Sequence, residues 1–135
     1  MTYPGVPSVF MGDELGFEGK SGEDARRTIN WEDRSSWDTT FFAEVKKLAK
    51  LRRTDDAFIN GGLRWVTAED NYLAYLRESK KSKVLVVIAA KPCTVDIDLS
   101  KLGYKVSKTL YGQKATGSKI KFKTNGATQG IWKLS

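Results

Sequence analysis

The stretch KVLVVIAAKPCTVDIDL (83–99) decides the fold of this chain of 135 residues. Its first half is a short apolar run that ends at polar turn residues. In its second half, Val95, Ile97 and Leu99 alternate with polar residues. Alternation with a period of two is typical of a strand that buries one face. The stretch therefore predicts two short β-strands, over 83–90 and 94–99.

Similar short segments lie on both sides of this stretch, and turn residues bound each of them. They cover residues 63–68, 71–78, 105–112, 118–124 and 129–135. Several short strands at this spacing predict an antiparallel β-sandwich over residues 63–135.

Large aromatic residues are spread through the predicted strands. They are Trp65, Tyr72, Tyr75, Tyr111 and Trp132. Apolar neighbours surround each of them, which favours packing in the core. The alternative is a surface on which sugar rings stack, and the sequence leaves it open.

A single strong helical pattern precedes the strands. Its apolar face consists of Phe41, Phe42, Val45, Leu48 and Ala49. This spacing of apolar residues predicts an amphipathic helix over about 39–53, with a capping residue at its start and basic residues at its end. Residues 55–62, which include the turn sequence Asn-Gly-Gly, are predicted to form a linker.

The N-terminal part of the chain holds one short apolar segment and a long polar loop. Residues 6–11 (VPSVFM) have the composition of a strand buried on both faces, and residues 12–37 are rich in glycine and acidic residues. Loops of this length are uncommon in compact domains and are often functional. One strand and one helix do not make a domain, so this part is predicted to be the last unit of something larger.

The composition excludes several classes of chemistry. The chain has no histidine and one cysteine, Cys93, so it can form neither a Ser-His or Cys-His catalytic pair nor an internal disulfide. No apolar run approaches the roughly 18 residues that span a bilayer, and a membrane partner is not expected. The net charge is +7, but the lysines are scattered, so nucleic acid is not an expected partner either.

Three segments resemble the alpha-amylase family of glycoside hydrolases. PGVPSVFMGDELG (4–16) is similar to the last strand of that family's barrel, with Gly-x-Pro, an apolar run, Gly-Asp-Glu and Gly in place. DARRTINW (24–31) resembles the Arg-Arg-Pro segment of the neopullulanase and cyclomaltodextrinase branch, although Thr28 replaces the proline. FFAEVKKLAKLRRTDDAFINGGL (41–63) is similar to the last barrel helix and its exit.

The resemblance implies a mainly β chain with three parts. Residues 1–54 would be the remnant of the last β/α unit of a (β/α)8 barrel, with its strand at about 6–11, its loop at 12–37 and its helix at about 39–53. Residues 55–62 would be the linker. Residues 63–135 would be the antiparallel C-terminal β-sandwich of the family.

The resemblance also implies the function. The chain would be the C-terminal portion of an enzyme acting on α-glucans such as starch, maltooligosaccharides or cyclodextrins, and by itself a stabilising domain without activity. In the family, the catalytic carboxylates come from earlier barrel strands. A freestanding carbohydrate-binding module is the alternative, and a basic nucleic-acid-binding domain is a weaker one.

No residue of this chain is expected to be catalytic. Retaining glycosidases need two carboxyl groups about 5–5.5 Å apart, whereas Asp13 and Glu14 are neighbours that point to opposite faces of an extended strand. By the resemblance, Asp13, Glu14, Arg26 and Trp31 are the candidates for contact with substrate at the rim of the barrel. The alternatives are that the carboxylates hold nearby loops, that Arg26 pairs with an acid of the loop, and that Trp31 covers the barrel.

Neither a metal nor a cofactor is expected. Glu18, Glu23 and Asp24 lack the alternating oxygen ligands of a calcium loop. The expected partners are the remainder of the barrel and an α-glucan in the intact enzyme. Without the barrel, residues 1–36 are expected to be extended, mobile or engaged with a second copy of the chain. The sequence leaves the compartment open, and the resemblance to cyclomaltodextrinases favours the cytoplasm.

Overall fold

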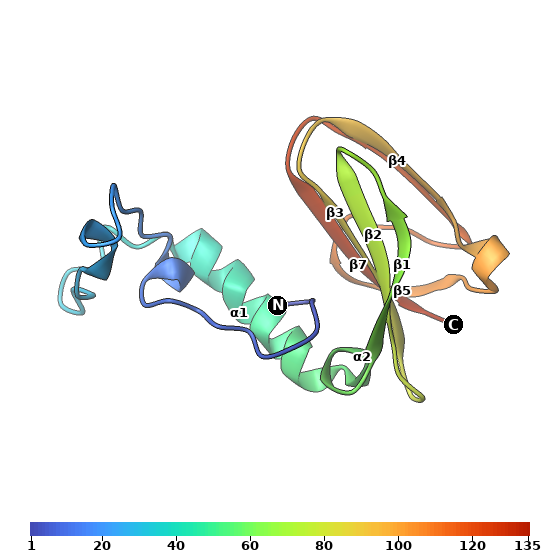
Figure 1. Cartoon of the computed structure of the whole chain (residues 1–135), viewed down its shortest axis with the longest axis horizontal. Coiled ribbons are helices and arrows are strands. Elements are labelled where there is room, and N and C mark those ends of the chain that lie inside the picture. The colour runs from blue at the N-terminus through green and yellow to red at the C-terminus, as the bar shows by residue number, and fades with distance from the viewer. The chain divides into compact units, whose positions relative to one another are not determined.

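The computed structural model describes residues 1–135, with the side chain of Ala25 left aside. The chain divides into two compact units (Figure 1). The first unit consists of Met1 and Gly5–Arg52. The second consists of Thr2–Pro4 and Arg53–Ser135.

The first unit contains two single turns of 3-10 helix and one long helix. The turns are η1 (Asp13–Leu15) and η2 (Asp24–Arg26), and the helix is α1 (Thr39–Thr54), whose last two residues are counted with the second unit. The carboxylate of Asp38 accepts a hydrogen bond from the Phe41 N–H at 2.8 Å, so Asp38 is the capping residue of α1. The helix agrees with the sequence prediction to within one residue.

The strand that residues 6–11 would form in a complete barrel is not formed in this chain. Residues 6–10 have no regular secondary structure, and a turn begins at Met11. A strand is completed by hydrogen bonds to a neighbouring strand, and the first unit offers none. The apolar side chains of this segment are therefore left in solvent, with Val6 94% and Phe10 53% exposed.

The second unit begins with a short helix and continues as seven strands. The elements are α2 (Asp56–Ile59), β1 (Gly62–Ala68), β2 (Tyr72–Glu78), β3 (Lys83–Ala89), β4 (Cys93–Asp98), η3 (Leu99–Leu102), β5 (Val106–Gly112), β6 (Lys119–Thr124) and β7 (Thr128–Leu134). All seven predicted strands are present. The segment 55–62 is not a plain linker, because it holds α2 and the first residue of β1.

The strands form two antiparallel sheets (Figure 1). Five strands pair in the order β1-β2-β3-β7-β5, and β4 pairs with β6. β3 lies at the centre of the larger sheet and is buried along most of its length, which explains its nearly continuous apolar sequence. The fold class predicted from the sequence, mainly antiparallel β with one long helix, is confirmed.

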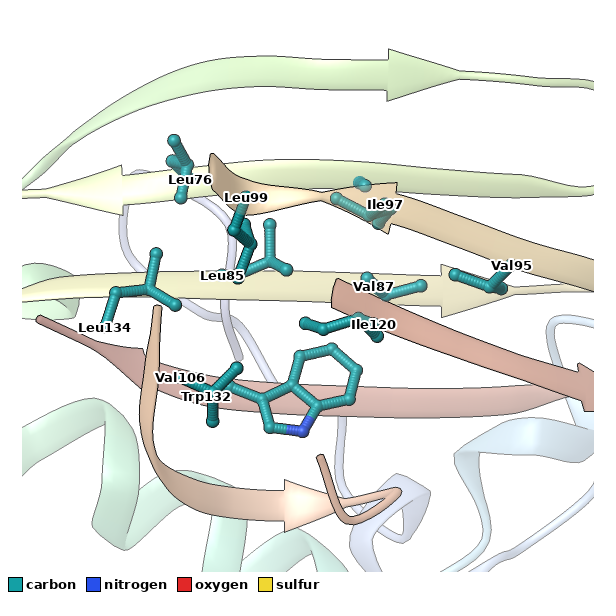
Figure 2. Packing of buried hydrophobic residues seen from close by; sticks show 11 residues of the cluster. Leu76, Leu85, Val87, Val95, Ile97, Leu99, Val106, Ile120, Trp132 and Leu134 are labelled. Carbon is teal, nitrogen blue, oxygen red and sulfur yellow. The ribbon is translucent and has the colours of Figure 1, made fainter. Parts of the chain in front are cut away.

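The core of the second unit lies between the two sheets (Figure 2). Trp132 of β7 is fully buried there with Val106 and Ile120, and its indole N–H donates to the Gln113 carbonyl at 2.8 Å. Tyr75 is buried as well, whereas Trp65 is 49% exposed. Core packing between the sheets thus accounts for Trp132, whereas Tyr75 is buried against the rings of Tyr3 and Trp65. Among the described residues, no helix is both long and apolar enough to cross a membrane.

Candidate functional site

The loop that follows residues 6–10 starts with a tight turn at Gly12. Gly12 has φ of 95°, and a Cβ atom on it would lie 2.7 Å from the Phe17 ring. Only glycine adopts this conformation without strain and leaves room for the ring. The Asp13 N–H donates to the Phe10 carbonyl at 3.0 Å, and the Phe17 N–H donates to the Gly12 carbonyl at 3.0 Å. The glycine of the Gly-Asp-Glu motif therefore shapes the turn.

The two carboxylates of the motif hold this turn. Asp13 accepts a hydrogen bond from the Phe10 N–H at 3.1 Å, and Glu14 accepts one from the Gly12 N–H at 3.1 Å. Both side chains thus bond to backbone N–H groups just before η1. The pair does not form the facing arrangement that acid–base cleavage of one glycosidic bond requires.

The base of the long loop is closed between η1 and the start of α1. Leu15 is buried, and its carbonyl accepts a hydrogen bond from the Asp38 N–H at 3.0 Å. Because the Asp38 side chain also caps α1, the Gly-Asp-Glu turn and the helix are joined through this residue.

The two neighbouring arginines of the loop differ in their contacts. Arg27 donates to the carbonyls of Glu18 and Asp24 and lies 3.4 Å from the Asp24 carboxylate. Arg26 is exposed, and no hydrogen bond or ion pair is found for its side chain among the described residues. Arg27 therefore holds the loop, and the Arg26 guanidinium is available to a ligand.

Trp31 and Trp37 form an edge-to-face pair. Their ring centroids are 5.5 Å apart at an interplanar angle of 84°, and the Arg34 guanidinium lies 4.9 Å from the Trp37 ring centroid. Trp31 is 64% exposed. The Trp37 indole nitrogen is buried without a hydrogen-bond partner among the described residues, which is unusual for a buried donor.

The structure does not gather the predicted site residues into one pocket. Asp13 and Glu14 are adjacent on η1, but among the described side chains no hydrogen bond, ion pair or ring contact joins them to Arg26 or Trp31. A hollow of about 400 Å³ in the first unit is lined instead by Gly16, Phe17, Glu18, Arg27, Thr28, Asn30 and Ser36. No group of three metal-ligating side chains occurs in the described part of the chain.

Sequence reasoning missed Arg77, which connects the start of β1 to the N-terminal segment of the second unit. Its side chain is only 2% exposed. The guanidinium donates to the Thr2 and Gly61 carbonyls at 2.7 Å and to the Phe58 and Gly62 carbonyls at 3.3 Å. An arginine in a strand with both faces apolar was the available signal, because such a position is seldom open to water.

A second polar cluster joins α2 to the end of the sandwich. The Lys133 ammonium donates to the Asp55 carboxylate at 2.7 Å and to the Ser82 hydroxyl at 2.6 Å. Asp55 also caps α2 by accepting from the Ala57 N–H at 3.0 Å. Burial alone would raise the pKa of Asp55, but these hydrogen bonds outweigh it and hold that pKa below its usual value.

Comparison with known proteins places this architecture in a known class. No family model matches the chain. The chain is 35% identical over 89 residues to a cyclomaltodextrinase of Bacillus sp. The matched region covers 64% of this chain and 16% of the relative. It is 32% identical over 90 residues to neopullulanase 2 of Thermoactinomyces vulgaris, 65% of this chain and 15% of the relative. The chain spans about one sixth of the length of these relatives.

Two solved structures match almost the whole chain. An alpha-amylase of Anoxybacillus superposes with a TM-score of 0.80 at 23% identity, over 99% of this chain and 30% of that one. A debranching enzyme of Nostoc punctiforme superposes with a TM-score of 0.77 at 22% identity, over 98% and 26%. The fold is that of the C-terminal part of alpha-amylase-family enzymes. The chain itself is related to that family, and its sequence matches include cyclomaltodextrinase and neopullulanase, as the resemblance predicted.

Proposed function

We propose that this chain forms the C-terminal part of an enzyme that hydrolyses or transfers α-glucans such as starch, maltooligosaccharides or cyclodextrins. The observation that carries the proposal is the match of 35% identity over 89 residues to a cyclomaltodextrinase. In such an enzyme the chain contributes structure rather than catalytic carboxylates. Residues 1–54 complete the barrel, the segment 55–62 connects, and residues 63–135 form the C-terminal sandwich.

Two features of the first unit support the proposal that another part of the enzyme covers it. The side chains of Val6, Val9, Phe10 and Met11 are exposed although they are apolar. Consecutive exposed apolar residues are typical of a surface that another element covers. The buried Trp37 N–H also lacks an acceptor among the described residues. A neighbouring barrel strand and loop would supply both the apolar cover and the acceptor.

The four predicted rim residues divide into two roles in this proposal. Asp13 and Glu14 keep the Gly-Asp-Glu turn in shape through their hydrogen bonds to backbone N–H groups. Arg26 and Trp31 contact the substrate, because both are exposed and the guanidinium is available to sugar hydroxyls or to a catalytic carboxylate. Within the second unit, Arg77 and Lys133 hold the segment around α2 to the sandwich.

The partners follow from the same proposal. The remainder of the barrel is the main one, and an α-glucan is bound by the intact enzyme. Without the barrel, residues 1–36 associate with a second copy. Nucleic acid is not an expected partner, because the lysines are scattered along the sequence rather than clustered.

A chimeric enzyme tests the proposal. The matched region of the Bacillus cyclomaltodextrinase is replaced by the corresponding residues of this chain, and hydrolysis of β-cyclodextrin is measured. We expect the chimera to fold and to retain activity, and the isolated chain to show none. A chimera carrying Arg26→Ala should lose activity, whereas one carrying Lys20→Ala should not. Turnover by the isolated chain, or a folded chimera without activity, would contradict the proposal.

A further inference from the structure

An open hollow of about 520 Å³ lies between the two sheets of the sandwich, outside the loop described above. Its walls come from β1, the β1–β2 turn, the start of β2, β4, η3 and β6. Tyr72 and Leu102 line it and also pack against the hydrophobic core, so one side of the hollow is apolar and fixed. A volume of this size lies within the range of small-molecule sites, about 300–1,000 Å³.

The rim of the hollow carries both acidic and basic side chains. Glu69, Asp96 and Asp98 provide carboxylates, and Lys101 and Lys119 provide ammonium groups. Three acids and two bases give a local charge near zero in a chain whose net charge is +7. Such a site does not concentrate anions or cations, and its mixture of donors and acceptors fits a neutral ligand with many hydroxyl groups.

Part of the rim is held in place by the protein itself. Asp98 caps η3 by accepting from the Ser100 N–H at 3.0 Å. Glu69 accepts from the Thr67 hydroxyl at 3.2 Å, and Asp96 pairs with Lys121. These contacts orient the carboxylates and leave further lone pairs for a ligand, because an ionised carboxylate accepts up to about four hydrogen bonds.

We propose that this hollow binds a short α-glucan, with one pyranose face against Tyr72 and sugar hydroxyls bonded to the charged rim. The neutral, hydroxyl-rich character of the ligand follows from the lining. Its assignment as an α-glucan rests on the proposed function. The site would hold a substrate chain on the sandwich.

A titration of the full 135-residue chain with maltotriose tests this site. Backbone amide NMR shifts should change saturably at residues 66–72 and 96–102 and at Lys119. Tyr72→Ala should weaken binding at least about fivefold, which corresponds to about 1 kcal/mol. Tyr111→Ala, at a half-buried tyrosine of β5, is the matched control and should leave the affinity unchanged. Asp96→Asn, an exposed rim substitution that keeps the fold, should also weaken binding.

Three results would overturn the site. The first is that no amide shift saturates up to about 50 mM maltotriose, a concentration at which even weak binding would be seen. The second is that only the amides of Trp31 and Trp65 shift. The third is that cellotriose binds as tightly as maltotriose. If the chimera is active but the titration is negative, only the glycan site in the hollow is refuted. If the chimera folds but is inactive, the proposed function is refuted.

Discussion

The Lys133 ammonium lies 2.7 Å from the Asp55 carboxylate, so the last strand of the sandwich is bonded to the residue that caps α2. The Asp55 side chain is only 9% exposed. Asp55 caps α2 and bonds to β7, so it joins the helix before the first strand of the second unit to the last strand.

The first prediction is that Asp55→Asn destabilises the chain in a pH-dependent way. Asparagine keeps the helix cap but removes the charge, so the loss should be about 1 kcal/mol at pH 7. Because folding lowers the pKa of Asp55, the charge stabilises the fold fully above about pH 4, and this contribution is lost as the pH falls through the folded pKa. Urea unfolding at pH 7 and pH 3 measures the difference, which should shrink at pH 3.

A matched control for this prediction breaks an exposed ion pair. Lys121→Gln removes the partner of Asp96 in a pair whose side chains are more than half exposed. Its effect on the free energy of unfolding should be smaller than that of Asp55→Asn. Equal effects of the two substitutions, or a pH-independent loss in Asp55→Asn, would contradict the role assigned to Asp55.

The second prediction concerns the buried guanidinium of Arg77. Arg77→Lys keeps the charge, but a single ammonium cannot reach the carbonyls of Thr2, Phe58, Gly61 and Gly62 together. Several buried acceptors then lose their donors, and we expect a loss of about 3 kcal/mol in the free energy of unfolding. Chemical denaturation followed by circular dichroism measures it. Arg64→Lys, at an exposed arginine paired with Glu78, should cost less, and a reversed order would refute the prediction.

The sequence predicted the sandwich well because its strands are complete within the chain. Each of the seven segments has its neighbours in the same unit, so alternation and turn residues sufficed to place it. The segment 6–11 has the same strand-like composition and forms no strand, because pairing is a property of two segments and the sequence shows only one. The helix α2 was missed because four residues are too short for an apolar period.

The candidate site was less predictable than the fold. The Gly-Asp-Glu motif indicated Asp13 and Glu14. Because of the turn at Gly12, both carboxylates bond to nearby backbone N–H groups. The division of labour between Arg26 and Arg27 depends on the path of the loop, which brings the Glu18 carbonyl to Arg27. The hollow beside Tyr72 is built from five separate elements, so no local pattern could indicate it.

The third prediction is that the isolated chain associates through its exposed apolar segment. Phe10 is 53% exposed beside Val9 and Met11, and burial against a second copy would remove this surface from water. Sedimentation velocity should show a concentration-dependent increase in mass. Phe10→Glu should reduce this increase in mass. Thr40→Glu, on an exposed turn of α1, is the matched control, and equal loss in both variants would argue against this segment.

The fourth prediction is that Gly130→Ala disrupts the core around Trp132. A Cβ atom at position 130 would lie 2.1 Å from the far edge of the Trp132 ring, so the buried indole must move. Moving it strains the core and breaks the bond from the indole N–H to Gln113, and we expect a loss of about 1–3 kcal/mol with a weaker near-ultraviolet circular dichroism signal. Gly126→Ala is the matched control, because a Cβ atom there meets nothing within 4 Å. If Gly130→Ala unfolds at the same urea concentration as Gly126→Ala, the close approach of the Trp132 ring to Gly130 is not the constraint that requires glycine at this position.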